Sequence, residues 1–192
     1  ALIGVFGALD GFVFYLFWEL ALIPIYFICA IWGEGDQKLK ITFKFFIYTF
    51  AGSLFMLAAM MYLYQHAGHS FDIDMLTKTA LPGQKGLFIL LAFFIAFAIK
   101  MPVFPFHTWQ PDTYTTAPAQ GTMMLSGIML KMGVYGVIRW MIPIGATSLT
   151  AIQPTIIMLS IVGIIYAAVI AIRQHDIKRI IAYSSFSHVG LI

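Results

Sequence analysis

Charged residues are scarce in this sequence of 192 residues, and apolar residues are abundant. Only 10% of the residues are Asp, Glu, Lys or Arg, whereas 61% are hydrophobic. An ordinary soluble domain has about a quarter charged and about half apolar residues. A soluble core of this size has no room for so much apolar surface, but a helix surrounded by lipid is apolar on all sides. The composition therefore predicts an all-α, polytopic transmembrane bundle.

The sequence also lacks the motifs of several functional classes. Its one cysteine, Cys29, lies in an apolar run, so the sequence offers neither a disulfide pair nor a thiolate metal site, and Cys29 is interpreted as a small buried residue. The dinucleotide-binding glycine fingerprint, the P-loop, HExxH and CxxC are absent, which predicts no nucleotide or metal site. The net charge is +3 and the basic residues sit in short clusters, so nucleic acid is not an expected partner.

The two ends of the sequence are expected to be internal points of a longer protein. The chain begins at Ala1 without a methionine, and no basic segment precedes the first apolar run as a signal peptide would require. It stops at Ile192, inside another apolar run. Residues 1–192 are therefore expected to form one transmembrane domain fragment, with spans missing at both ends.

Several apolar runs reach the length of about 20 residues that a membrane-spanning helix needs. Residues 1–9 are expected to be the tail of an earlier span, and residues 65–85 an extramembrane loop. The predicted spans are Phe12 to Trp32, Ile41 to Tyr64, about Ala117 to Met141, about Ile152 to Ile172, and one that begins near Ile177.

One apolar run is too short to cross the bilayer. Residues 86–99 lead into Lys100, Pro102 and Pro105 without a polar loop, which is typical of a broken helix. Irregular backbone at membrane depth is tolerated where protein or a water-filled cavity satisfies the freed amides, so the break favours a functional site. Trp109 to Asp112 are expected to form an interfacial turn, with Asp112 capping the next helix.

The basic residues predict how the chain is oriented, because cytoplasmic loops carry an excess of Lys and Arg. If the spans alternate and the broken segment crosses once, one side receives Lys78, Lys85 and Arg139. The other side, predicted to be cytoplasmic, receives Lys38, Lys40, Lys44, Arg173, Lys178 and Arg179.

Glu19 and Lys100 are charges at membrane depth. Glu19 lies about 10 Å along its predicted helix, where a charge costs a few kcal/mol unless protein, water or an opposite charge offsets it. Lys100 lies at the break, where a desolvated amine can take up and release a proton. The alternatives are a protonated or hydrogen-bonded Glu19 and a Lys100 that snorkels to the interface, but phenylalanines flank Lys100 on both sides.

Lys131 falls in the middle of its predicted span, roughly 20 Å from the start, which is beyond the reach of snorkelling. Small residues on either side, Ser126 with Gly127 and Gly133 with Gly136, predict close helix approach, so that Lys131 faces protein. His107 and His188 are candidate relays because imidazole exchanges protons near neutral pH. The alternative for each histidine is a core or interface residue whose hydrogen bonds are satisfied.

A family resemblance runs through the whole chain, in motifs that follow one order. These are Phe17-Trp18-Glu19-Leu20 with Pro24, the stretch from Lys100 to Asp112, Ala117-Pro118, Leu130-Lys131, Tyr135-Gly136, and the stretch from Asp176 to Ser185. They resemble the antiporter-like subunits of respiratory complex I, and the surroundings of Glu19 and Lys131 are most similar to the M branch of bacterial NADH:quinone oxidoreductase. Tyr114 stands where many members of that branch have histidine, so no relay role is assigned to it.

The resemblance implies a fold of two inverted repeats, each with a broken helix, that conducts protons without a redox cofactor. It implies an ion pair between Glu19 and Lys100, with Lys131 passing the proton on and His188 as a further relay. The chain would then serve a proton-translocating oxidoreductase in the bacterial inner membrane, beside sister antiporter-like subunits. NADH, FMN, iron–sulfur clusters and quinone are expected in partner subunits. The alternatives are a subunit of a multi-subunit sodium/proton antiporter and a passive membrane spacer.

Overall fold

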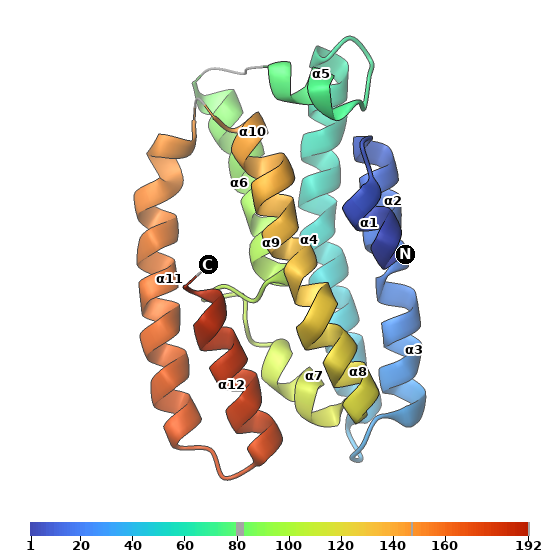
Figure 1. Ribbon diagram of the computed structural model, residues 1–192, viewed down its shortest axis with the longest axis vertical. Coiled ribbons are helices and arrows are strands. Elements are labelled where there is room, and N and C mark those ends of the chain that lie inside the picture. The colour runs from blue at the N-terminus through green and yellow to red at the C-terminus, as the bar shows by residue number, and fades with distance from the viewer. Residues whose placement is uncertain (80–82, 147, 192) are drawn as a thin grey trace.

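The chain forms a bundle of helices that run mostly along one common axis (Figure 1). The computed structural model describes residues 1–79, 83–146 and 148–191, and the named elements within these ranges are all helices. They are α1 (Leu2–Gly7), α2 (Gly11–Leu20), α3 (Leu22–Trp32), α4 (Lys38–His66), α5 (Ile73–Lys78), α6 (Gln84–Lys100), α7 (Gln110–Thr116), α8 (Ala119–Met124), η1 (Leu125–Met129), α9 (Leu130–Gly136), η2 (Val137–Met141), α10 (Ile142–Ile144), α11 (Leu149–Ile172) and α12 (Ile177–Val189).

Four helical stretches are long and apolar enough to cross a membrane. They are Gly11–Trp32, Lys38–His66, Ala119–Ile144 and Leu149–Ile172. Each coincides with a predicted span, within a few residues at either end. Large apolar side chains cover the outer surface of the bundle, as lipid-facing helices require. The prediction of a polytopic transmembrane helix bundle is confirmed.

Aspartates cap the starts of three helices, α2, α5 and α12. Asp10 accepts hydrogen bonds from the backbone amides of Phe12 (2.8 Å) and Val13 (3.0 Å) at the start of α2, and Asp176 does the same for Lys178 at the start of α12. Such caps satisfy amides that have no partner within the helix. The predicted loop at residues 65–85 contains a further helix, α5, which Asp72 caps. Residues 80–82 of that loop lie outside the described residues.

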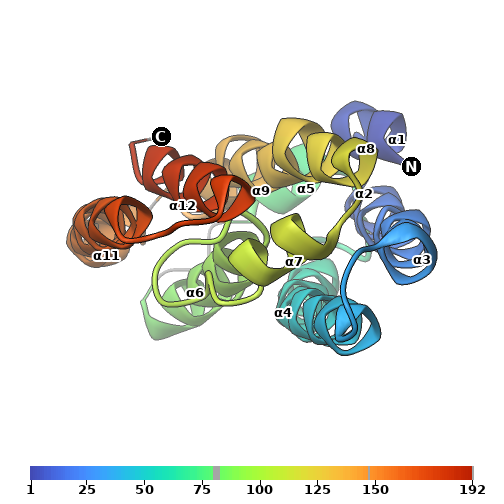
Figure 2. The ribbon, with the colours of Figure 1, turned by 90° about the horizontal axis from the view of Figure 1, so that it is seen from below.

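Helix α6 ends at Lys100, and a non-helical segment of residues 101–109 separates it from α7. The indole N–H of Trp109 donates to the carbonyl oxygen of Ile99 at 2.8 Å, and its ring packs on Phe45 of α4, with centroids 5.0 Å apart. Trp109 therefore ties the end of α6 to α7 and α4. Figure 2 shows α7 near the middle of the bundle, with α4, α6, α8 and α12 around it.

The expected capping role of Asp112 is wrong. Asp112 lies in the first turn of α7, whose N-cap is Trp109 and has no side-chain cap. The Asp112 carboxylate instead lies 3.5 Å from Lys44 Nζ and 3.2 Å from the guanidinium of Arg179. Two cations from α4 and α12 attract the side chain away from the amides of its own helix.

Two glycines bring α9 against α6. A Cβ atom at Gly133 would lie 2.8 Å from Met101 Cβ, and one at Gly136 would lie 2.5 Å from the ring of Phe97. Both distances are shorter than side chains tolerate, so only glycine permits this approach. The contact brings the span that carries Lys131 directly against the end of α6.

Candidate proton path

Lys100 is the last residue of α6 and is buried in the middle of the bundle. Its side chain is only 3% exposed, and its Nζ has no hydrogen-bond partner among the described residues. The ring of Trp18 from α2 lies beside it, with Nζ 5.4 Å from the ring centroid. An ammonium over an indole face gains a cation–π attraction, which is stronger when both groups are desolvated. The fold thus buries an amine in the interior of the bundle.

Glu19 occupies the last turn of α2, one residue after the Trp18 that faces Lys100. Its Oε1 is buried and has no hydrogen-bond partner within residues 1–79, 83–146 and 148–191. The carboxyl lies near the Ser53 side chain of α4 and close enough to Lys100 for electrostatic attraction. The Ser53 hydroxyl donates to the Phe50 carbonyl at 2.7 Å, so its oxygen remains available as an acceptor.

Glu19 and Lys100 are neighbours without direct contact. The ion pairs within 4.0 Å in the described part of the chain are Lys44–Asp112, Lys178–Glu34 and Arg179–Asp112. Glu19 is half-buried, with Oε1 fully covered, and Lys100 is buried, so the two form a pair in which one proton can sit on either group. Such a pair, in an apolar surrounding, is well suited to proton transfer and has no evident purely structural use.

Lys131 lies on another face of its helix. Its side chain is exposed in this structure, and Nζ donates to the carbonyl oxygen of Ser126 at 2.6 Å. Successive helix residues turn by about 100°, so Lys131 and Gly133 point in nearly opposite directions. The prediction that close approach at the glycines surrounds Lys131 with protein is therefore wrong for the described residues, because that approach is to α6.

The two candidate histidines have different surroundings. His107 is 5% exposed and lies among three aromatic rings, with centroids 4.5 Å from Phe186, 5.1 Å from Tyr166 and 5.7 Å from Phe104. Its Nδ1 has no partner in the described ranges. His188 is exposed, and its Nδ1 lies 2.7 Å from the Ser184 carbonyl oxygen. No hydrogen bond or ion pair joins either histidine to Glu19 or Lys100 among the described residues.

Sequence reasoning missed Trp18 and Ser53, which both face the buried charges. Trp18 adjoins Glu19 in the chain, but only the fold directs its ring towards Lys100. Ser53 belongs to a recurring polar pattern on the buried side of α4, where Thr42, Thr49 and Ser53 are all at most 3% exposed. The spacing of these small hydroxyl residues was a usable signal, since they share one helix face.

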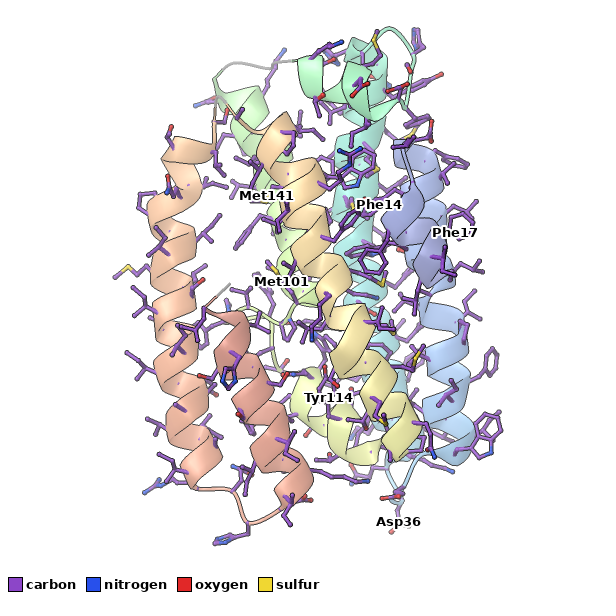
Figure 3. The ribbon with its side chains drawn as sticks, in the orientation of Figure 1. Phe14, Phe17, Asp36, Met101, Tyr114 and Met141 are labelled. Carbon is purple, nitrogen blue, oxygen red and sulfur yellow. The ribbon has the colours of Figure 1, made fainter. Side chains whose placement is uncertain are left out.

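The predicted grouping of basic residues is confirmed. We define the charged end as loops 33–37 and 173–176, which lie at the lower end of the bundle (Figures 1 and 3), together with the ion-paired residues Lys44, Asp112, Lys178 and Arg179. Lys178 of α12 lies 2.9 Å from Glu34, and Arg179 and Lys44 both pair with Asp112. Loops that are far apart in the sequence therefore meet on one side, as the alternation of spans requires. That this side is cytoplasmic stays a prediction.

Comparison with known proteins gives consistent results over the whole chain. A model of the family described as "NADH:quinone oxidoreductase/Mrp antiporter, TM" matches residues 8–192. NADH-quinone oxidoreductase subunit M of Rickettsia prowazekii is 44% identical over 99% of this chain and 39% of its own length. Subunit M of Rhodobacter capsulatus is 43% identical, covering 100% and 40% respectively. The NADH-ubiquinone oxidoreductase chain 4 of Marchantia polymorpha is 40% identical.

Solved structures show the same arrangement of helices. A chain of respiratory complex I from Thermus thermophilus superposes with a TM-score of 0.91 and 33% identity, covering 99% of this chain and 41% of that one. A chain of an archaeal membrane-bound sulfane sulfur reductase gives a TM-score of 0.82 at 25% identity, covering 98% and 39%. The chain thus spans about two fifths of the length of the relatives that it matches.

Proposed function

The chain belongs to the NADH:quinone oxidoreductase/Mrp antiporter transmembrane family, and on that premise we propose that it is a proton-conducting part of an M-type subunit of NADH:quinone oxidoreductase. The observation that carries the proposal is the burial of Lys100, 3% exposed, beside Trp18 and within electrostatic reach of Glu19. A buried charge of this kind costs several kcal/mol and adds nothing to stability, so its presence favours a functional role.

In this proposal Glu19 and Lys100 share a proton in the middle of the bundle. A proton that arrives from one side neutralises Glu19 or recharges Lys100, and each change alters the attraction that the other group feels. Lys131 then receives the proton; its span packs against the end of α6 through Gly133 and Gly136, although the Lys131 side chain itself lies on the opposite face of that helix. His188 is a candidate for the next step, and His107 for a side relay. No electron moves in any of these steps.

The break after Lys100 has a role in the same scheme. We interpret α6 and α7 as two halves of one discontinuous helix, interrupted by Pro102 and Pro105, in one repeat of an inverted-repeat fold. Pro102 is buried in the interruption, and prolines cannot donate backbone hydrogen bonds. Irregular backbone at membrane depth is tolerated where it lines a hydrated or protein-filled site, so an interruption next to Lys100 is consistent with access of water to its amine.

The redox chemistry is assigned to other subunits. NADH, FMN, iron–sulfur clusters and quinone are expected there, and quinone reduction would drive proton movement in this chain through a change in the Glu19–Lys100 attraction. The expected partners are the other membrane subunits, including the sister antiporter-like subunits, with lipid around the bundle. The similarity to bacterial M subunits favours the bacterial inner membrane as the location of this chain.

A second candidate function is transport in a multi-subunit sodium/proton antiporter. The description of the matching family includes the Mrp antiporter, which is the observation in its favour. The same buried pair would then exchange protons against sodium without a redox partner. A passive spacer, the third alternative, leaves the cost of burying Lys100 unexplained. Sodium-dependent proton movement in vesicles without a quinone reductase would favour the antiporter.

Substitution of Glu19 tests the proposal. Glu19→Gln keeps the size of the side chain and removes its charge and its ability to release a proton. In membrane vesicles that contain the full-length subunit in its assembled complex, we expect proton pumping and the coupled quinone reductase activity to fall strongly. Asp10→Asn, at the N-cap of the same helix, is the matched control for the loss of a carboxylate. Pumping at the wild-type rate by a fully assembled Glu19→Gln complex would refute the proposed role.

Labelling of single cysteines tests the orientation. Cysteines introduced at Lys38, next to loop 33–37, and at Arg173 are expected to react only with reagents that reach the cytoplasm, since both positions lie at the charged end. A cysteine at Lys85, at the start of α6, is expected to react from the opposite side. Reaction of both charged-end probes with an outside-only reagent would reverse the proposed topology.

A further inference from the structure

Two polar side chains are buried in α7, and the proton path above uses neither of them. Gln110 is 0% exposed and Tyr114 is 2% exposed. Both amide atoms of Gln110 and the hydroxyl of Tyr114 have no hydrogen-bond partner among the described residues. The two residues lie four positions apart on one helix, so they share a face, and the Gln110 amide adjoins the Tyr114 hydroxyl.

These groups lie between the charged end and the level of Lys100. Figure 3 shows Tyr114 inside the lower half of the bundle, below Met101, which follows Lys100, and above Asp36 at the charged end. Helix α7 contacts α4 on one side and α12 on the other. From α4, the buried Thr42 adds another hydroxyl without a partner in the described ranges. Unpartnered polar atoms from two helices in contact therefore lie in the interior of the bundle, with Tyr114 between the charged end and the level of Met101.

The burial of an unsatisfied amide is unfavourable. A primary amide has two N–H donors and a carbonyl acceptor, and each group that is left unsatisfied costs free energy. A leucine at position 110 would have nearly the same volume and none of this cost. Buried polar groups without protein partners are ordinarily satisfied by ordered water, which forms about three hydrogen bonds. Gln110, Tyr114 and Thr42 together offer the donors and acceptors that such water needs.

We propose that Gln110 and Tyr114 are positioning residues that hold water in a lane from the charged end to Lys100. The inference rests on the proposed function, because it supplies the route by which protons reach the Glu19–Lys100 pair. A hydronium proton from the charged end passes to a water held by Tyr114, that water releases another proton towards the Lys100 amine, and the amine becomes an ammonium. The two positioning side chains keep their own protons and charges throughout.

The test compares two substitutions of Tyr114 in the full-length subunit, within the assembled complex in membrane vesicles. Tyr114→Phe keeps the ring and removes only the hydroxyl, whereas Tyr114→His gives up ring volume and keeps a hydrogen-bonding group. If Tyr114 orders water, His retains pumping and Phe lowers the pumping rate about tenfold, the factor expected for one lost hydrogen bond. If Tyr114 only fills space, the Phe variant should pump faster than the His variant. Gln110→Leu is expected to resemble Tyr114→Phe.

Tyr26→Phe is the matched control, because Tyr26 lies on α3 and packs against Phe27 and Phe46, not against α7. It should pump as the wild type does. Wild-type pumping by both Tyr114→Phe and Gln110→Leu, with Glu19→Gln impaired in the same assay, would overturn the water lane and leave the proposed function standing. Wild-type pumping by Glu19→Gln as well would overturn both. A solvent deuterium isotope effect that is larger in Tyr114→Phe than in the wild type supports the lane.

Discussion

The ionisable side chains that pair at the charged end are partly or largely exposed, whereas Glu19 and Lys100 in the middle of the bundle are half-buried and buried, and form no close ion pair among the described residues. At the charged end, Lys178 pairs with Glu34 at 2.9 Å, and Asp112 lies between Lys44 and Arg179, with side chains that are 34–70% exposed. In the middle, Lys100 is 3% exposed and forms no ion pair within 4.0 Å in the described part of the chain.

We expect this difference to separate charges that stabilise the structure from charges that take part in proton transfer. An exposed pair contributes between zero and about 1 kcal/mol, because water already solvates both partners. A buried amine gains no such solvation, so its protonation state responds strongly to any nearby charge. Substitutions in the middle should therefore change activity much more than stability, and substitutions at the charged end should do the reverse. The predictions below test that contrast, starting with the largest expected effect.

Lys100→Met should have the largest effect, because it replaces the amine with an apolar side chain of similar length. We expect proton pumping to fall by about 100-fold or more, which is the scale of a lost proton-transfer group. The thermal stability of the assembled complex should stay level or rise, since a buried charge has been removed. Lys85→Met, at an exposed site in the first turn of the same helix, is the control. Wild-type pumping by Lys100→Met would show that the buried amine is not needed for activity, and the contrast between the two regions would fail.

Lys131 is an intermediate case, because its side chain is exposed in this structure although the residue lies near the middle of its span. Lys131→Ala removes the charge, whereas Lys131→Arg keeps the charge and holds its proton too tightly to release it. We expect both variants to pump poorly at normal assembly levels, measured as proton uptake in reconstituted vesicles. Arg139→Ala, further along the same span, is the control. Normal pumping by the Arg variant alone would make Lys131 a counter-charge without a transfer role.

Asp112→Asn tests the charged end through stability. It removes the carboxylate shared by Lys44 and Arg179, which should lower the free energy of unfolding by about 1–2 kcal/mol. Salt screens exposed charges, so the difference in thermal midpoint between wild type and variant should shrink as salt rises from about 0.1 M to about 1 M. Asp36→Asn, an exposed neighbour without an ion pair in the described ranges, should change little. A loss that is independent of salt would assign Asp112 a role other than ion pairing.

Glu34→Gln should have the smallest effect. The Glu34 side chain is 70% exposed, so its pair with Lys178 is worth less than about 1 kcal/mol. The backbone N–H of Glu34 also donates to the Thr116 carbonyl at 2.7 Å, which holds the loop in place without the side chain. Both pumping and the thermal midpoint are expected to stay close to wild type. A marked loss of pumping would extend the functional region to the charged end.

The family and the spans could be predicted from the sequence because both depend on local patterns. Runs of about 20 apolar residues identify membrane helices without any tertiary information, and four of them are helical here. The grouping of basic residues followed from the alternation of spans. The charges at positions 19, 100 and 131 stand out as candidates because ionisable residues are rare within apolar runs.

Only the tertiary structure decided what surrounds each charge. A helix places a side chain on one of its faces, but packing determines whether that face meets protein, which is why Lys100 is buried and Lys131 is exposed. Packing also determined that Asp112 faces two cations from other helices instead of its own amides. Hydropathy is a local property that the sequence determines by itself, whereas contacts between distant segments depend on how the helices pack.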